Sequence, residues 1–70
     1  MNLFVNGEPR AHEADTVEAL FRAEAEEAGI EGPQGVAIAL NGRVLRRRDW
    51  AETAIREGDR IEIVRAMQGG

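Results

Sequence analysis

The chain has no cysteine and no lysine among its 70 residues. Without cysteine it can form neither disulfides nor thiolate sites, so packing alone must hold the fold. Without lysine it offers no ε-amino group for isopeptide bonds, which argues against a protein that builds polymers of itself. Genomic base composition would also explain the missing lysine, but the chemical consequence is the same.

A long apolar run and an N-terminal signal sequence are absent as well, so we expect a soluble cytoplasmic protein without a membrane partner. His12 is the single histidine, and without cysteine it has no second ligand beside it, so we predict no metal site. A chain of 70 residues has no room for a deep substrate cavity beside its core. These absences argue against an enzyme with an active site of its own.

The charge is acidic overall and unevenly divided. The net charge is −4, with eight acids and two arginines in residues 1–35 and five acids and seven arginines in residues 36–70. An acidic domain does not suit nonspecific binding to phosphate backbones. The three arginines of Arg46–Arg48 have no interleaved aromatic residue, which is typical of a solvated loop. We therefore predict no nucleic acid partner.

The first part of the chain predicts a β-hairpin. Residues 1–6 alternate in polarity in the manner of a strand. Asn6-Gly7 favours a type I′ turn, because both central residues of that turn have positive φ. Residues 8–13 would return as a short polar strand, and Pro9 places that strand at a sheet edge because proline has no N–H.

The next segment predicts an amphipathic helix. Asp15 is the expected N-cap, with Glu18 completing a capping box, and Thr16 is the close alternative. Gly29 would end the helix, because glycine adopts the left-handed conformation of a C-terminal cap. The expected buried stripe consists of Val17, Leu20, Phe21, Ala25 and Ala28. The residues expected on the solvent side are Glu24, Glu26 and Glu27.

The second half of the chain predicts three more strands. They span residues 36–40, 43–45 and 60–66, and Asn41-Gly42 forms a second hairpin turn between the first two. The segment between the last two strands would be irregular or contain a helical turn, anchored in the core by Trp50 and Ile55.

The predicted order of elements is therefore ββαβββ. One amphipathic helix can cover only one face of a sheet, so we expect an α+β fold of two layers, with the helix packed on one face of a mixed sheet. Residues 1–66 would form this domain, and residues 67–70 would form a flexible tail.

Gly69-Gly70 follows the last predicted strand closely. Two residues without side chains make a thin tail, whose carboxylate could enter a pocket closed to any residue with a Cβ. A frayed terminus that happens to be glycine is the alternative, since chain ends are commonly disordered. The two glycines alone do not decide between these interpretations.

One pattern runs through the chain and is most specific in its second half: Val36–Gly42, the Arg47-x-x-Trp50 spacing, Glu57–Val64 and the closing Gln68-Gly69-Gly70. With this pattern the chain resembles the ubiquitin-like β-grasp sulfur carriers, above all the small carriers of thiamine (thiazole) biosynthesis. Arg46 is a departure, because the family usually has a proline there. The resemblance implies a β-grasp fold in which the first and last strands lie parallel at the sheet centre.

The resemblance also implies a chemical role for the tail. Gly70 would carry the reacting carboxylate, at the end of a tail formed by Met67, Gln68 and Gly69. An ATP-dependent adenylating partner of the E1 type would activate the carboxylate, and a sulfur donor such as a cysteine desulfurase would convert it to a thiocarboxylate. Thiazole synthase would then receive the sulfur. The carrier itself would need no catalytic residue and no cofactor, because its partners supply the electrostatics.

We expect the partners to bind the sheet face that the helix leaves open. An apolar patch with a charged rim suits such binding, although scattered apolar residues are common on any surface. The expected patch consists of Phe4, Ala37, Ala39, Val64 and Ala66, and the expected rim of Arg60, Glu62 and Arg65.

Three alternatives remain open at this point. The chain could carry sulfur for another pathway, such as molybdopterin or cysteine synthesis. It could be a β-grasp binding module whose glycine tail has no role. It could also be a ubiquitin-like modifier that forms an amide through Gly70.

Overall fold

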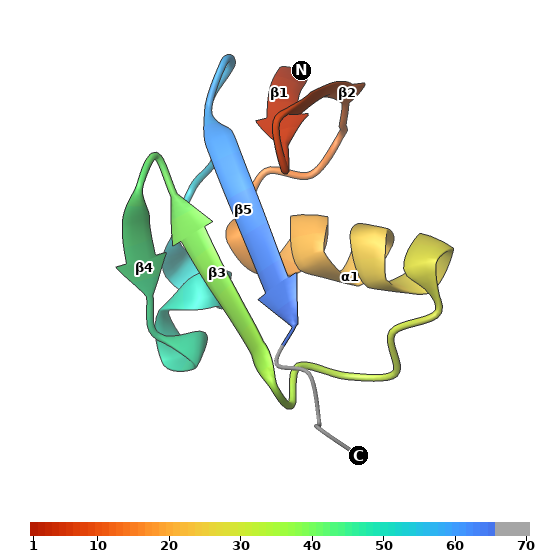
Figure 1. Ribbon diagram of the computed structural model, residues 1–70. Coiled ribbons are helices and arrows are strands. Elements are labelled where there is room, and N and C mark those ends of the chain that lie inside the picture. The colour runs from red at the N-terminus through yellow and green to blue at the C-terminus, as the bar shows by residue number, and fades with distance from the viewer. Residues whose placement is uncertain (66–70) are drawn as a thin grey trace.

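The computed structural model describes residues 1–65 and shows one helix packed on a five-stranded sheet (Figure 1). The strands are β1 (Asn2–Val5), β2 (Glu8–Ala11), β3 (Val36–Leu40), β4 (Arg43–Leu45) and β5 (Arg60–Arg65). The helix α1 spans Val17–Ala28, and a 3₁₀ helix, η1, spans Arg47–Glu52. The predicted α+β class and the order ββαβββ are confirmed.

The sheet has the strand order β2-β1-β5-β3-β4. β1 and β5 run parallel, with Val5 opposite Ile61, and the other neighbouring strands pair antiparallel. The first and last strands of the chain therefore lie side by side at the sheet centre, as the resemblance implies. β2 is an edge strand, as Pro9 predicts.

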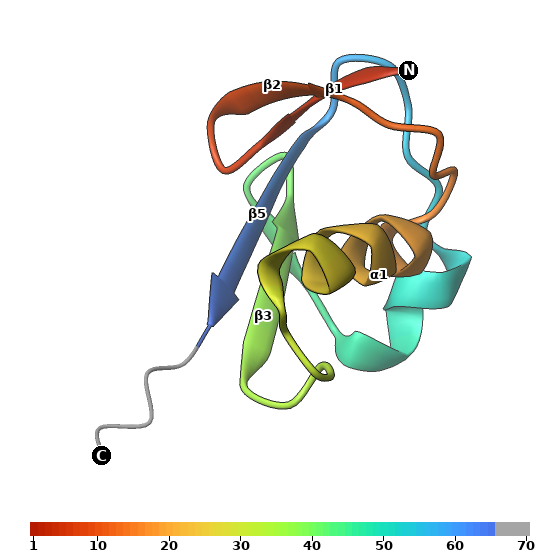
Figure 2. The same cartoon turned by 90° about the vertical axis from the view of Figure 1, so that its right-hand side faces the viewer.

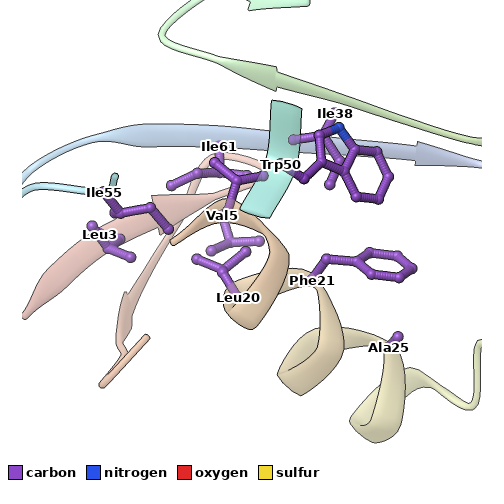
Figure 3. Close-up of a cluster of buried hydrophobic side chains, with 10 residues drawn as sticks. Leu3, Val5, Leu20, Phe21, Ala25, Ile38, Trp50, Ile55 and Ile61 are labelled. Carbon is purple, nitrogen blue, oxygen red and sulfur yellow. The ribbon is translucent and has the colours of Figure 1, made fainter. Parts of the chain in front are cut away.

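The core lies between the sheet and a layer made of α1 and η1, which Figure 2 shows on the same side of the sheet. Trp50 and Ile55 are both buried, so the predicted anchors of the irregular segment are confirmed. Within residues 1–65, no helix has the length and apolar character needed to cross a membrane. The buried side chains, most of them drawn in Figure 3, are Leu3, Val5, Val17, Leu20, Phe21, Ala25, Ile38, Trp50, Ile55 and Ile61.

Both Asn-Gly pairs form the predicted hairpin turns. Asn6 and Gly7 have φ values of 52° and 82°, and Asn41 and Gly42 have 52° and 85°. A Cβ added to Gly7 would meet no atom within 4 Å. Conformation rather than space therefore selects glycine here, because positive φ is costly for residues with a Cβ.

The prediction that Asp15 caps the helix is wrong, and Thr16 is the N-cap. The Thr16 hydroxyl accepts the backbone N–H of Ala19 at 3.2 Å. Thr16 also forms an antiparallel bridge with Ala54, which holds its backbone extended, as an N-cap requires. A tertiary contact therefore decides between two good capping residues. At the other end Gly29 adopts φ 75° and ends the helix as predicted.

Two residues of α1 lie differently from their predicted places. Glu24 is not on the solvent side, because its carboxylate contacts His12 Nε2 at 2.7 Å and Arg10 Nη1 at 3.6 Å. The contact ties the β2 strand and the chain just after it to the helix. Ala28 is exposed rather than buried. Ile30, which donates its N–H to Ala25 O at 2.8 Å, packs on that end of the core instead.

Candidate partner-binding face

The face of the sheet opposite α1 carries the apolar residues predicted to bind partners. Phe4 and Val64 are 42% and 61% exposed. Ala37 is exposed and Ala39 is half-buried on β3. These four residues alternate with the buried residues of their strands, so all four lie on the open face. Ala66, the fifth predicted member, lies outside the described residues.

Two charged residues of β5 lie within this face rather than around it. Arg60 stands opposite Phe4, and Glu62 stands opposite Ala39. The apolar surface is therefore divided into a part at Phe4 and a part where Ala37 and Val64 are paired. Arg65, predicted as part of the rim, follows the alternation of Ile61 and Ile63 and does not belong to this face.

Val44 belongs to the same face and was missing from the prediction. It lies opposite Ala39 on β4 and is 73% exposed. The period of two over residues 43–45 could have identified it, because Leu45 packs inward. The open face is therefore defined here by Phe4, Ala37, Ala39, Val44 and Val64.

A shallow hollow of about 840 Å³ lies at the N-terminal end of β5, between the two hairpin turns. Arg60 and Glu62 line it together with Phe4. Its wall is fixed by Asn41, whose Oδ1 accepts the N–H of Arg60 at 2.9 Å and whose Nδ2 donates to Asp59 at 3.1 Å. The hollow is open and lined by both charges, which suits contact with a protein surface.

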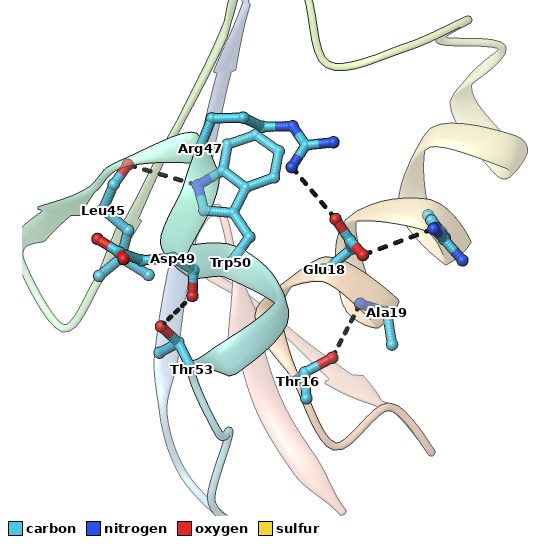
Figure 4. Close-up of polar contacts among 9 residues, drawn as sticks. Thr16, Glu18, Ala19, Leu45, Arg47, Asp49, Trp50 and Thr53 are labelled. Atoms are coloured by element: carbon cyan, nitrogen blue, oxygen red, sulfur yellow. Dashed lines mark hydrogen bonds and ion pairs between the residues drawn. The ribbon is translucent and has the colours of Figure 1, made fainter.

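Trp50 holds together the layer of α1 and η1, which lies on the other side of the sheet from the open face. Figure 4 shows the polar contacts around Trp50. Trp50 Nε1 donates to Leu45 O at 3.4 Å, and its ring lies 5.2 Å from that of Phe21. The guanidinium of Arg47 lies 5.0 Å from the Trp50 ring and also pairs with Glu18 at 3.2 Å. The Arg47-x-x-Trp50 spacing thus joins η1 to the helix, and the middle arginine of Arg46–Arg48 has a structural role.

The predicted reacting group and its tail, Gly70, Gly69, Gln68 and Met67, lie outside the described residues. The last described strand, β5, ends at Arg65. Across residues 1–65 there is no group of three or more His, Asp or Glu side chains that could hold a metal ion. The described part of the molecule offers surfaces for binding.

A mixed sheet with parallel first and last strands and one helix across it defines the ubiquitin-like β-grasp class. The sequence model described as the ThiS family matches residues 3–70. The chain belongs to the ThiS family, and so stands among carrier proteins rather than enzymes.

Individual relatives agree with this assignment. The sulfur carrier protein ThiS of Thermus thermophilus is 37% identical, over 97% of this chain and 98% of its own length. The crystal structure of the thiamine biosynthesis protein ThiS from Geobacter metallireducens matches with a TM-score of 0.77 and 34% identity, over the full length of both chains. The solution structure of a thiamine biosynthesis protein from the same organism matches with a TM-score of 0.76 and 33% identity, over all of this chain and 88% of that one.

One further relative is a larger protein. A thiazole synthase of Paramagnetospirillum magneticum is 37% identical over 71 aligned positions. The match covers 100% of this chain and 20% of the synthase. A region similar to the whole of this chain is therefore part of that enzyme's own polypeptide.

Proposed function

We propose that this protein is a sulfur carrier of thiamine biosynthesis whose sulfur is held on the Gly70 carboxylate. The observation that carries the proposal is the similarity to a curated sulfur carrier over 97% of this chain. The family match, which extends through residue 70, supports the inclusion of the glycine tail in that role.

The chemistry proceeds in two steps, because a carboxylate does not react with sulfur nucleophiles directly. An E1-like partner joins the Gly70 carboxylate to AMP from ATP and releases pyrophosphate. Hydrosulfide, supplied by a donor such as a cysteine desulfurase, then attacks the acyl carbon, and AMP leaves with the bonding electron pair. The products are AMP, a proton and the Gly70 thiocarboxylate.

The thiocarboxylate delivers its sulfur to a carbon electrophile held by thiazole synthase. This partner is supported by the relative in which a region similar to this chain belongs to a thiazole synthase. We place the whole sequence of reactions in the cytoplasm, where ATP is available.

The folded domain serves as the handle for the tail. Residues 67–70 span at most about 14 Å, at roughly 3.5 Å per residue, which is enough to enter an active site while the domain binds outside it. The open face, which Phe4, Ala37, Ala39, Val44 and Val64 define, is the proposed docking surface, and Ala66 remains a predicted member of it. Met67, Gln68 and Gly69 connect that surface to the reacting carbon.

Intact mass measurement tests the proposal. The protein is incubated with ATP, the adenylating enzyme and a sulfide source, and a mass increase equal to the replacement of one oxygen by sulfur is expected. A variant lacking Gly70 should show no increase while its thermal melt stays unchanged, since the terminal residue contributes little to the core.

Other results point to the alternatives. An unchanged mass with an active adenylating enzyme would indicate an inert binding module. Covalent conjugates with other proteins would indicate a modifier. A thiocarboxylate that thiazole synthase does not consume would indicate a carrier for another pathway, such as molybdopterin or cysteine synthesis.

A further inference from the structure

The second half of β5 has a neighbour on only one side. β3 follows it to its last residue, since Val36 lies opposite Arg65. On the other side the parallel pairing with β1 ends where Val5 lies opposite Ile61, and the chain turns away at Asn6-Gly7. Figure 1 shows β5 continuing past the end of β1. The β1-side edge of Ile63–Arg65 is called the open edge below.

The hydrogen bonds show which backbone groups point toward the open edge. Asn6 N–H donates to Ile61 O at 2.9 Å, so the backbone groups of Ile61 point to the β1 side. Strand residues alternate in this respect, so those of Ile63 and Arg65 point the same way. The N–H of Ile63 is taken by the side chain of Asn6, whose Oδ1 lies 2.8 Å away. Further along the open edge, no backbone group of residues 1–65 pairs with the carbonyl of Ile63 or with the N–H of Arg65.

The other two edges of the sheet are less suited to adding a strand. β2 carries Pro9, which has no N–H. β4 lies at the opposite edge of the sheet, where β3 separates it from β5. Proline on an edge strand is a device that prevents strand addition. The open edge lacks proline and comes directly before the tail in the sequence.

We propose that an extended segment of thiazole synthase adds to the open edge as a strand, in line with β1, when it receives the tail. The proposal rests on the proposed function, because it names the partner that consumes the sulfur on Gly70. Main-chain hydrogen bonds to Ile63 O and Arg65 N would fix the register of β5 against that partner. Backbone pairing of this kind supplies affinity, and the side chains on either face supply specificity.

The position of the open edge and one of the relatives identify thiazole synthase as the source of the added strand. A strand paired at Ile63–Arg65 lies next to the residues that lead to Gly70, so it sets the direction in which they enter the partner. Thiazole synthase is chosen because a region similar to this whole chain is part of a synthase polypeptide in one relative.

Asn6 limits the register of the added strand, because its side chain already occupies the N–H of Ile63. The incoming strand must therefore donate to Ile63 O and accept from Arg65 N–H. The residue of the incoming strand that makes both hydrogen bonds would place its side chain on the open face beside Val64, which favours an apolar residue at that position.

Proline at position 65 isolates the backbone donor. Because the N–H of Arg65 points away from β3, Arg65→Pro removes a group of the open edge and no hydrogen bond to β3. The residue before a proline prefers extended backbone, which Val64 already has. Arg65→Ala is the matched control, since it removes the same side chain and keeps the N–H. The two variants should therefore melt at similar temperatures.

Binding of each full-length variant to purified thiazole synthase is the first measurement. We expect Arg65→Pro to raise Kd about tenfold relative to Arg65→Ala, as the loss of one buried hydrogen bond does. Equal binding by the two variants overturns the proposal.

Amide hydrogen exchange of the unmodified protein is a second measurement that needs no variant. The Arg65 amide should exchange at least about tenfold more slowly in the complex than in the free protein. Unchanged exchange overturns the proposal. Slowing that follows the concentration of the free protein identifies a second copy as the occupant and also overturns it.

The two proposals fail in different ways. A protein that forms the thiocarboxylate but keeps a fast Arg65 amide in the complex upholds the carrier function and overturns strand addition. A protected Arg65 amide without any thiocarboxylate upholds strand addition and overturns the sulfur chemistry.

Discussion

Asn6 Oδ1 accepts the backbone N–H of Ile63 at 2.8 Å, so a turn residue of the first hairpin holds the last strand of the chain. The two residues are 57 positions apart. Asn41 makes the corresponding contact from the second hairpin, with its Oδ1 2.9 Å from Arg60 N. Asparagine therefore has two roles in each turn: it tolerates positive φ, and its side chain extends the pairing of β5.

Replacement of Asn6 should separate these two roles. Asn6→Gly keeps the turn conformation and removes the acceptor, so we expect a loss of about 0.5–1.5 kcal/mol in the free energy of unfolding. Asn6→Ala adds the strain of positive φ, which costs roughly 1–2 kcal/mol more. Urea denaturation of both variants measures the difference, and equal losses would show that the conformational role is negligible.

The two candidate caps of α1 predict opposite results. Thr16→Ala removes the acceptor of the Ala19 N–H and should destabilise the protein by about 0.5–2 kcal/mol. Asp15→Ala should change stability by less than about 0.5 kcal/mol, as exposed substitutions usually do. Thermal melts of the two variants, compared with the wild type, check this order. A larger loss for Asp15→Ala would contradict the assignment of the N-cap.

Among the positions outside the sheet, we expect substitution of Trp50 to cause the largest loss in the free energy of unfolding. It is 1% exposed, contacts Phe21 and donates to Leu45 O. Trp50→Ala should cost about 3–5 kcal/mol, which is a large part of the stability of a small domain. Trp50→Phe keeps an aromatic contact but leaves a cavity and an unpaired carbonyl, so a smaller loss is expected. Circular dichroism in denaturant measures both, since neither variant keeps the tryptophan fluorescence.

Arg47→Ala is the control for the tryptophan variants. It removes the cation–π contact and the pair with Glu18 but leaves the core filled, and the Arg47 side chain is 55% exposed. Its loss should stay below about 1 kcal/mol, because exposed ion pairs contribute little. A loss as large as that of Trp50→Ala would mean that the contacts of Arg47, rather than the burial of Trp50, hold η1 on the core.

Local patterns in the sequence predict much of this fold. Alternation places Phe4 and Val64 on the open face, and each Asn-Gly pair predicts a turn whose φ values the structure confirms. Gly29 ends the helix for the same local reason. These features depend on residues that are neighbours in the chain, so the sequence contains the information directly.

Contacts between distant elements account for what the sequence does not predict. The N-cap depends on a bridge from Thr16 to Ala54, which no local pattern reveals. The charge of Glu24 predicts a place on the solvent side, although Glu24 follows Leu20 by four residues and so lies on the buried side of α1. The sequence does not show that β2 and the chain after it bring Arg10 and His12 to its carboxylate there. The division of the open face by Arg60 and Glu62 follows from the register between β1, β5 and β3.

The open face provides the last prediction. Val64 is 61% exposed, so Val64→Asp should leave the thermal melt close to that of the wild type. The same change puts a charge in the part of the proposed docking surface where Ala37 and Val64 are paired, and burial of that charge against a partner is costly. We expect the Kd for the adenylating enzyme to rise by about tenfold or more, as when an apolar contact of an interface is replaced by an unpaired charge.

Ala23→Asp is the matched control for this experiment. Ala23 is exposed on α1, on the other side of the molecule, so the variant carries the same added charge without touching the open face. It should bind the adenylating enzyme as the wild type does and form the thiocarboxylate at an equal rate. If Val64→Asp matched Ala23→Asp in both measurements, the partner would have to approach from another side, and the apolar residues around Val64 would be ordinary surface.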